Sequence, residues 1–151
     1  IALITGLLFA FSIAINRALR FIADLEYIHT MQAINRAIIN PAFLLCFIGT
    51  LPGFVITAWL WYRDFGFDST LVVILLASTI YFFGVFGITV RFNVPLNNAL
   101  ANVNTHSLSV TEIKNTRKAY EQPWVKYHNL RMLASILCLA CMLYSLLKHC
   151  L

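Results

Sequence analysis

His128 and Arg131 are the side chains in this sequence best suited to chemistry, and they lie three residues apart. Residues at that spacing share a face of a helix, and Ser135 follows four residues later on the same face. An imidazole can act as a general base, and a guanidinium can stabilise an oxyanion. We therefore take His128 and Arg131 as candidate catalytic residues.

Amide and aromatic side chains come from the same level of the predicted structure. Polar groups near lipid are costly unless they are paired, so convergent amides indicate a functional site. The candidate substrate-binding residues are Gln32, Asn35, Asn93, Asn97, Trp124 and Asn129. We expect Asn93, Asn97 and Asn129 to form one hydrogen-bonded cluster centred on Arg131. The alternative is that the amides only cap helix ends and that Arg131 extends to lipid head groups.

The sequence contains no recognisable metal or cofactor motif. The histidines are scattered, at His29, His106, His128 and His149, without the spacing of a metal site or a haem attachment site. Cys138 and Cys141 lie within an apolar run, where packing is the favoured interpretation. A glycine-rich nucleotide loop and a serine nucleophile elbow are also missing. We expect no metal and no cofactor.

The composition is that of a membrane protein. Hydrophobic residues make up 60% of the 151 residues and charged residues 11%, compared with roughly 25% charged residues in soluble domains. So few charges cannot cover a soluble surface, and lipid must be the solvent for much of this one. The excess of cationic residues falls in two connections and not on one face, which argues against nucleic-acid binding.

The sequence predicts an all-α fold, an integral membrane four-helix bundle forming one transmembrane domain. A bilayer core of about 30 Å needs roughly 20 apolar residues per helix. The spans are expected at about residues 1–20, 42–62, 71–92 and 130–147, with connections at 21–41 and 93–129. Pro95 is expected to end the third helix. The first apolar run is short and has no initiating Met, so we expect the sequence to begin inside or just before its first span; a signal peptide is the less favoured alternative.

The first connection is predicted to contain an additional amphipathic helix at the membrane surface, from about Asp24 to Ile39, with Asp24 as its N-cap. Its polar stripe consists of His29, Gln32, Arg36 and Asn40. The second connection is polar, with a charged helical stretch around residues 110–119.

The distribution of Lys and Arg predicts the orientation. Nine of the 11 lie in or beside the two long connections, whereas only Arg63 and Lys148 lie on the opposite side. The positive-inside rule then places both connections in the cytoplasm and both termini outside.

Several short motifs resemble the anthrone-oxygenase-like family of small four-helix membrane proteins. They are Met31-Gln32-x-Ile34-Asn35, Asn40-Pro41-x-Phe43, Asn93-Val94-Pro95-Leu96-Asn97, and Trp124 leading to Asn129-x-Arg131. The resemblance implies a chain of the bacterial plasma (inner) membrane. Some fungal relatives oxidise an anthrone to an anthraquinone with molecular oxygen and no evident cofactor, while most bacterial relatives have no assigned role.

The resemblance also implies a mechanism for a lipophilic aromatic ligand. His128 would remove a methylene proton, Arg131 and the amides would stabilise the oxyanion, and Trp124 would form a flat apolar wall. The alternative is a non-catalytic accessory or structural subunit of a larger membrane protein complex, and a transporter is a weaker third hypothesis. The expected protein partners are further copies of the chain, in a homo-oligomer, or the subunits of such a complex. A cavity lined by Trp124, His128, Asn97 and Arg131 would favour the enzyme, and bonds to backbone carbonyls alone would favour the subunit.

Overall fold

The computed structural model describes residues 1–150, and every regular element among them is helical. The elements are α1 (Ala2–Ala10), the π-helical η1 (Phe11–Ile15), α2 (Asn16–Leu19), α3 (Asp24–Ala37), α4 (Pro41–Phe65), α5 (Ser69–Ile80), the π-helical η2 (Tyr81–Gly87) and η3 (Thr89–Asn93), α6 (Val94–Ala101), the 3₁₀ turn η4 (Thr105–Ser107) and α7 (Val110–Cys150). These merge into four continuous helices long and apolar enough to span a membrane, Ala2–Leu19, Pro41–Phe65, Ser69–Ala101 and Val110–His149. The predicted all-α membrane bundle is confirmed.

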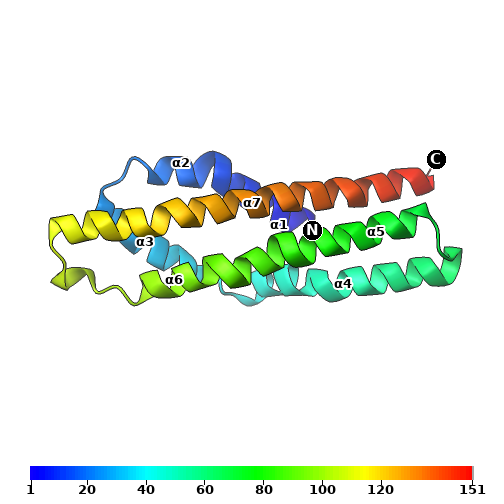
Figure 1. Cartoon of the computed structure of the whole chain (residues 1–151), viewed down its shortest axis with the longest axis horizontal. Helices are drawn as coiled ribbons and strands as arrows, with labels where there is room; N and C mark the ends of the chain where they lie inside the picture. Colours follow the sequence, from blue (N-terminus) through cyan, green and yellow to red (C-terminus); the bar gives the residue numbers. More distant parts are fainter. Residues whose placement is uncertain (151) are drawn as a thin grey trace.

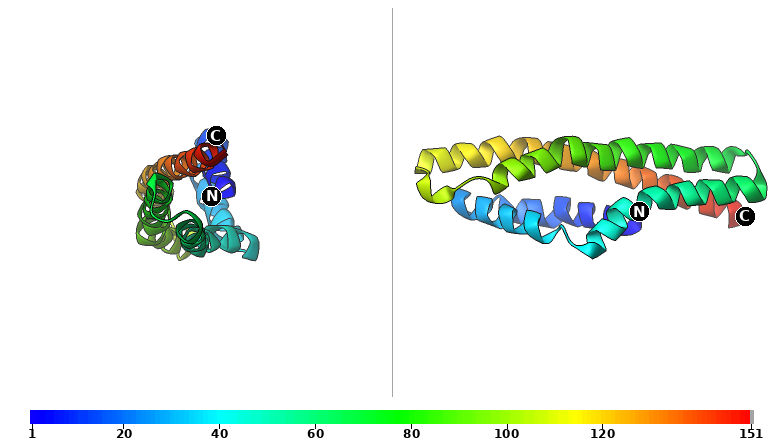
Figure 2. Two further views of the ribbon diagram at one scale, coloured as in Figure 1. Left: turned by 90° about the vertical axis from the view of Figure 1, so that its right-hand side faces the viewer. Right: turned by 90° about the horizontal axis from the view of Figure 1, so that it is seen from below.

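The four long helices form an elongated bundle in which α7 runs the full length (Figure 1). Around the bundle, α7 neighbours α5 and α1, and both of these neighbour α4 (Figure 2). The turn before α3 and the turn before α7 lie at the same end of the molecule, which we call the connection end; the C-terminus lies at the opposite end (Figure 1). At the connection end, α3 and α6 both pack on the first part of α7.

Two apolar clusters form the interior. The first joins α1, α4, α5, η2 and α7 through residues that include Leu8, Phe47, Tyr81, Val85 and Cys138. The second joins α2, α3, α6 and α7 at the connection end and includes Leu19, Met31, Leu100, Tyr120 and Trp124. The first helix, the third helix and α7 each contribute to both clusters. Between the two clusters, each of these helices has buried polar side chains.

Pro95 does not end the third helix, contrary to the sequence-based expectation. The helix continues through η3 and α6 to Ala101. Pro95 lies in the first turn of α6, directly after a π-helical turn in which the amide of Val94 donates to the carbonyl of Thr89. Because the helix is continuous, Pro95 leaves one carbonyl of the preceding turn without an amide partner, and the wider π turn reduces the clash of its ring with that turn.

Two other helix boundaries differ from expectation. Helix α7 is continuous from Val110, so most of the second connection is helical, and only residues 102–109 separate it from α6. Helix α3 matches the predicted helix over Asp24–Ala37, but its N-cap is Ala23, and Asp24 stands in the first turn. From there the Asp24 carboxylate accepts a 3.0 Å hydrogen bond from Arg117. The position of α3 at the membrane surface and the exact limits of the spans stay predictions.

Arg117 fixes α7 to the start of α3. Its guanidinium donates to the carbonyl oxygens of Leu19 and Ile22 at 3.1 and 2.9 Å, and also bonds Asp24 and Glu121. It therefore satisfies carbonyl groups that the end of α2 leaves without helical partners.

Candidate functional site

A layer of polar side chains lies between the two apolar clusters. We call it the polar layer, and it consists of Ser12, Asn16, Thr89, Asn93, His128 and Arg131. The first helix and the third helix each contribute a pair spaced four residues apart, and α7 contributes a pair spaced three apart, so each pair occupies one helix face. Two π-helical segments, η1 and η3, run through the layer. Such segments occur frequently at functional sites.

The His128 side chain is held on several sides. It is only 1% exposed. Its Nε2 atom lies 2.9 Å from the hydroxyl of Ser12. Its ring lies parallel to that of Trp124, at 5.1 Å between centroids and 6° between planes, and the Phe11 ring packs at 5.8 Å. The imidazole therefore has a defined position without any carboxylate partner in the described chain.

Arg131 is a buried cation without an acidic partner. It is 8% exposed, donates to Thr89 Oγ1 at 3.1 Å, and contacts His128 Nδ1 at 3.4 Å. Within residues 1–150, the arginines paired with carboxylates are Arg63 and Arg117. Since an unpaired charge is costly away from water, the site is suited to an anionic or oxyanionic group.

The contact with Arg131 defines the protonation of His128. A guanidinium can only donate hydrogen bonds, so Nδ1 of the imidazole must be the acceptor and must carry no proton. The remaining ring hydrogen is then on Nε2 and points to Ser12. The Nδ1 lone pair, which accepts from Arg131, is the basic site of this neutral imidazole.

Three polar atoms of the polar layer have no hydrogen-bond partner. They are Asn16 Nδ2, Asn93 Oδ1 and Arg131 Nε, and all three are buried. Asn93 uses its amide nitrogen to donate to the carbonyl of Trp124 at 3.3 Å. Buried polar groups are normally paired with protein or water. Two free donors and one free acceptor in one layer are therefore available to a polar ligand or to water.

A second hydrogen-bond network lies on the connection-end side of the polar layer. Asn97 Oδ1 accepts from the Trp124 indole at 2.8 Å and from the Tyr120 hydroxyl at 3.0 Å, and Asn35 donates to that hydroxyl at 3.2 Å. The network joins α3, α6 and α7. The network also fixes the Trp124 ring, which packs on the imidazole of His128.

The predicted single cluster centred on Arg131 is wrong. Arg131 bonds Thr89 and His128 and not the amides, since Asn93 and Asn97 lie one and two turns beyond Thr89 on the third helix. Asn97 belongs to the second network, and Asn129 is exposed on the outer face of α7. Gln32 lies outside both groups and donates to the carbonyls of Leu100 and Val103. Whether any of these residues binds substrate stays a prediction.

Sequence reasoning missed Ser12, Asn16, Thr89 and Tyr120 as members of these networks. A signal for three of them is present in the chain. Ser12 and Asn16 form a four-residue polar pair within an otherwise apolar helix, and Thr89 stands four residues before Asn93. Polar pairs on one face of an apolar helix are expected to turn toward other helices.

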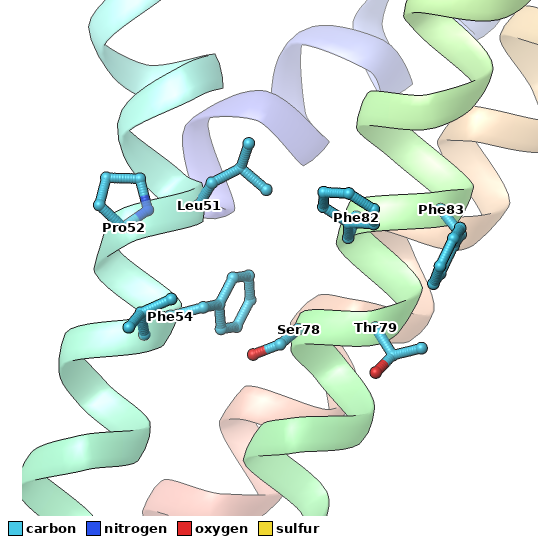
Figure 3. A pocket seen from close by; sticks show the side chains of 8 residues that line it. Leu51, Pro52, Phe54, Ser78, Thr79, Phe82 and Phe83 are labelled. Atoms are coloured by element: carbon cyan, nitrogen blue, oxygen red, sulfur yellow. The ribbon is translucent and has the colours of Figure 1, made fainter.

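Two cavities lie elsewhere on the molecule. A groove of about 390 Å³ separates α4 from α5 and η2, and Phe54, Ser78 and Phe82 border it (Figure 3). A smaller one of about 220 Å³ lies between α6 and α7 and is bordered by Tyr120. His128 and Arg131 border neither. Within the described chain, no group of three or more His, Cys, Asp and Glu residues is placed to hold a metal ion.

Four long apolar helices around a buried polar layer define a helical integral membrane protein. The family model described as anthrone oxygenase matches residues 43–141, about two-thirds of the chain, so the chain belongs to the anthrone oxygenase family and the resemblance is confirmed. No curated protein matches the chain, and neither does any solved structure. The matched segment contains the polar-layer residues of the third helix and of α7, but not Ser12 or Asn16.

Proposed function

We propose that the polar layer binds the oxyanion of a lipophilic aromatic compound and promotes its oxidation by molecular oxygen. The observation that carries the proposal is the buried Arg131 guanidinium, which has no carboxylate partner and lies beside a neutral imidazole. A cation in this position is complementary to a charge that develops on a substrate oxygen. Membership of the anthrone oxygenase family supports an anthrone as the model substrate.

The chemistry assigns a separate task to each side chain. His128 Nδ1 takes one proton from the methylene carbon of the anthrone, and the resulting carbanion is equivalent to an aromatic alkoxide. Arg131 stabilises the alkoxide oxygen, and the free donor of Asn16 and the amide of Asn93 lie in the same layer. The methylene proton is acidic for a C–H group, because its loss gives an alkoxide whose central ring is aromatic.

The oxidation balances with O₂ as the only other reactant. The carbanion gives its electron pair to O₂, a carbon–oxygen bond forms, and the proton on His128 returns to give a hydroperoxide. The O–O bond then breaks as the second methylene proton leaves, which releases water and creates the new carbonyl. The sum is anthrone plus O₂ to anthraquinone plus water, with His128 regenerated.

A second candidate function is an accessory subunit of a larger membrane assembly. Gln32 and Asn93 donate to backbone carbonyls, as expected of side chains that brace helices. In that case the amides would hold α3 and α6 on α7 and would contact no ligand. The orphaned atoms of the polar layer support the binding function, whereas the two cavities support this one, because neither is bordered by His128 or Arg131.

The test is oxygen consumption by the protein in lipid nanodiscs. A hydroxylated anthrone is supplied, and O₂ uptake and anthraquinone absorbance are recorded against empty nanodiscs, because anthrones also oxidise spontaneously. We expect one O₂ consumed per anthraquinone at a rate well above the blank. His128→Gln and Arg131→Leu should fall to the blank rate, whereas Arg36→Leu, which removes an exposed arginine of α3, should not. A wild-type rate equal to the blank would reject the oxygenase.

A further inference from the structure

We propose that an anionic phospholipid binds to the outer face of the third helix and α7, with its phosphate on Arg91 and Lys126 and with these two cations held in place by a pair of stacked aromatic rings. Arg91 and Lys126 are exposed, whereas Asn93 and His128, two residues further along the same helices, are buried. Residues two apart on a helix point in different directions. The lipid site therefore lies on the opposite side of these helices from the polar layer.

The aromatic pair joins the two helices at this point. The rings of Phe92 and Tyr127 lie 4.1 Å apart between centroids and within 8° of parallel. The guanidinium carbon of Arg91 lies 5.4 Å from the Phe92 centroid, and the ammonium nitrogen of Lys126 lies 5.9 Å from the Tyr127 centroid. Cations are attracted to aromatic faces at such distances. Contacts therefore run without a break from Arg91 through the two rings to Lys126, and they keep both charges at one place on the surface.

The two cations have no acidic partner in the described chain. Within residues 1–150, the cationic side chains in ion pairs are Arg63 and Arg117. The sequence has no Asp or Glu between Asp68 and Glu112, and none after Glu121, whose carboxylate is bonded to Arg117. The patch is therefore positive without compensation, which makes it complementary to a phosphodiester. An arginine can donate two parallel hydrogen bonds to a phosphate, and a lysine adds a point charge.

The surroundings of the patch favour a lipid over a dissolved phosphate. The predicted spans of the two helices end at about residues 92 and 130, so the cations lie near the level of the head groups, where tyrosine is also enriched. From Lys126 toward the middle of the span, the same face of α7 carries Leu130, Leu133 and Leu137, and all three are exposed. This apolar stripe can receive an acyl chain while the cations hold the phosphate.

Native mass spectrometry in detergent tests the site, because no charged bilayer surface then attracts the chain and only lipid held at a site stays bound. The protein is titrated with phosphatidylglycerol and, separately, with zwitterionic phosphatidylcholine that has the same acyl chains. We expect the wild type to retain phosphatidylglycerol in preference. Arg91→Gln combined with Lys126→Gln should lower its affinity at least about tenfold, since each cation near an anionic lipid contributes roughly fivefold.

The matched control is Arg36→Gln combined with Lys118→Gln, which also removes two exposed cations of the connection end. This control should bind phosphatidylglycerol as the wild type does. Phe92→Leu keeps both charges but removes the ring stack, and it should lose part of the affinity.

Four results would overturn the proposal. Equal losses in the two double variants would mean that net charge alone attracts the lipid. Equal retention of the two lipids by the wild type would mean that the charge of the head group is not recognised. Wild-type affinity in Phe92→Leu would mean that the ring stack does not position the cations. Displacement of phosphatidylglycerol by the same concentration of glycerol phosphate would make the patch a site for a soluble anion.

Discussion

The imidazole of His128 and the indole of Trp124 lie face to face, 5.1 Å apart and within 6° of parallel. The family resemblance implied that Trp124 would form a flat apolar wall for a substrate, but one face of its ring is occupied by His128. The indole N–H is bonded to Asn97. Asn97 therefore acts on the candidate base indirectly, by fixing the ring on which the base rests.

Replacing Arg131 with Leu should stabilise the fold while abolishing ligand binding. Arg131 is a buried charge without a carboxylate, and burying an unpaired charge costs free energy that an apolar side chain does not cost. Unfolding in nanodiscs measures the effect, with Arg36→Leu as a control expected within roughly 0.5 kcal/mol of wild type. A clear loss of stability in Arg131→Leu would instead make Arg131 a structural brace.

Replacing Asn97 with Leu should destabilise the connection end by about 1–3 kcal/mol, because the Trp124 N–H and the Tyr120 hydroxyl both lose their acceptor. The control is Asn98→Leu at the neighbouring exposed position. Unfolding followed by Trp fluorescence is the measurement. If the two variants unfold alike, the network contributes little to stability.

Replacing Gly84 with Ala should separate the third helix from α7. A Cβ at Gly84 would lie 2.7 Å from the Cβ of Ala134, so the two helices would have to move apart. Overpacking of this kind costs about 1–3 kcal/mol. Gly6→Ala is the matched control, since a Cβ there meets nothing within 4 Å. Equal melting temperatures for both variants would contradict this close approach.

Acid should weaken the cap of α5. The Leu71 amide and the Trp61 indole donate to the Asp68 carboxylate, and they hold the pKa of Asp68 below its usual range. A carboxyl group whose pKa is lower in the folded state stabilises the fold fully above its unfolded pKa of about 4. That stabilisation is lost as the pH falls through the folded pKa. Asp68→Asn keeps an acceptor but no charge. Its melting temperature should therefore fall less than that of the wild type between neutral pH and acid, and a parallel decline would contradict the assignment.

The orientation predicted from the Lys and Arg distribution can be tested by cysteine labelling. After Cys150 is replaced with Ser, a Cys at the exposed Thr111 should react with an impermeant maleimide only when cells are broken. A Cys at the exposed Asp64, in the last turn of α4 at the opposite end of the bundle, should react in intact cells. The reverse pattern would place the connection end outside.

Hydropathy and length were sufficient to predict the four long helices, because apolar runs of about 20 residues have few alternative structures. The spacing of its polar residues predicted α3. The helix through Pro95 could not be predicted, since the sequence does not reveal that a π-helical turn precedes it. His128 and Arg131 were found by their spacing. Their partners Ser12 and Thr89 come from residues 116 and 42 positions away, and only the packing of the long helices brings them together.

Helix α7 has 41 residues, which corresponds to about 60 Å, twice the thickness of a hydrocarbon core. Arg117 bonds the outer part of α7 to the Ile22 carbonyl and to Asp24 at the start of α3, so we expect α7 and α3 to tilt together when the surrounding lipid is longer or shorter. We therefore expect the bundle to tilt as a unit when its hydrophobic length differs from that of the bilayer. On this expectation, acyl-chain length would change the depth of Arg131 below the head groups, and the surrounding lipid would be part of the environment of the buried cation.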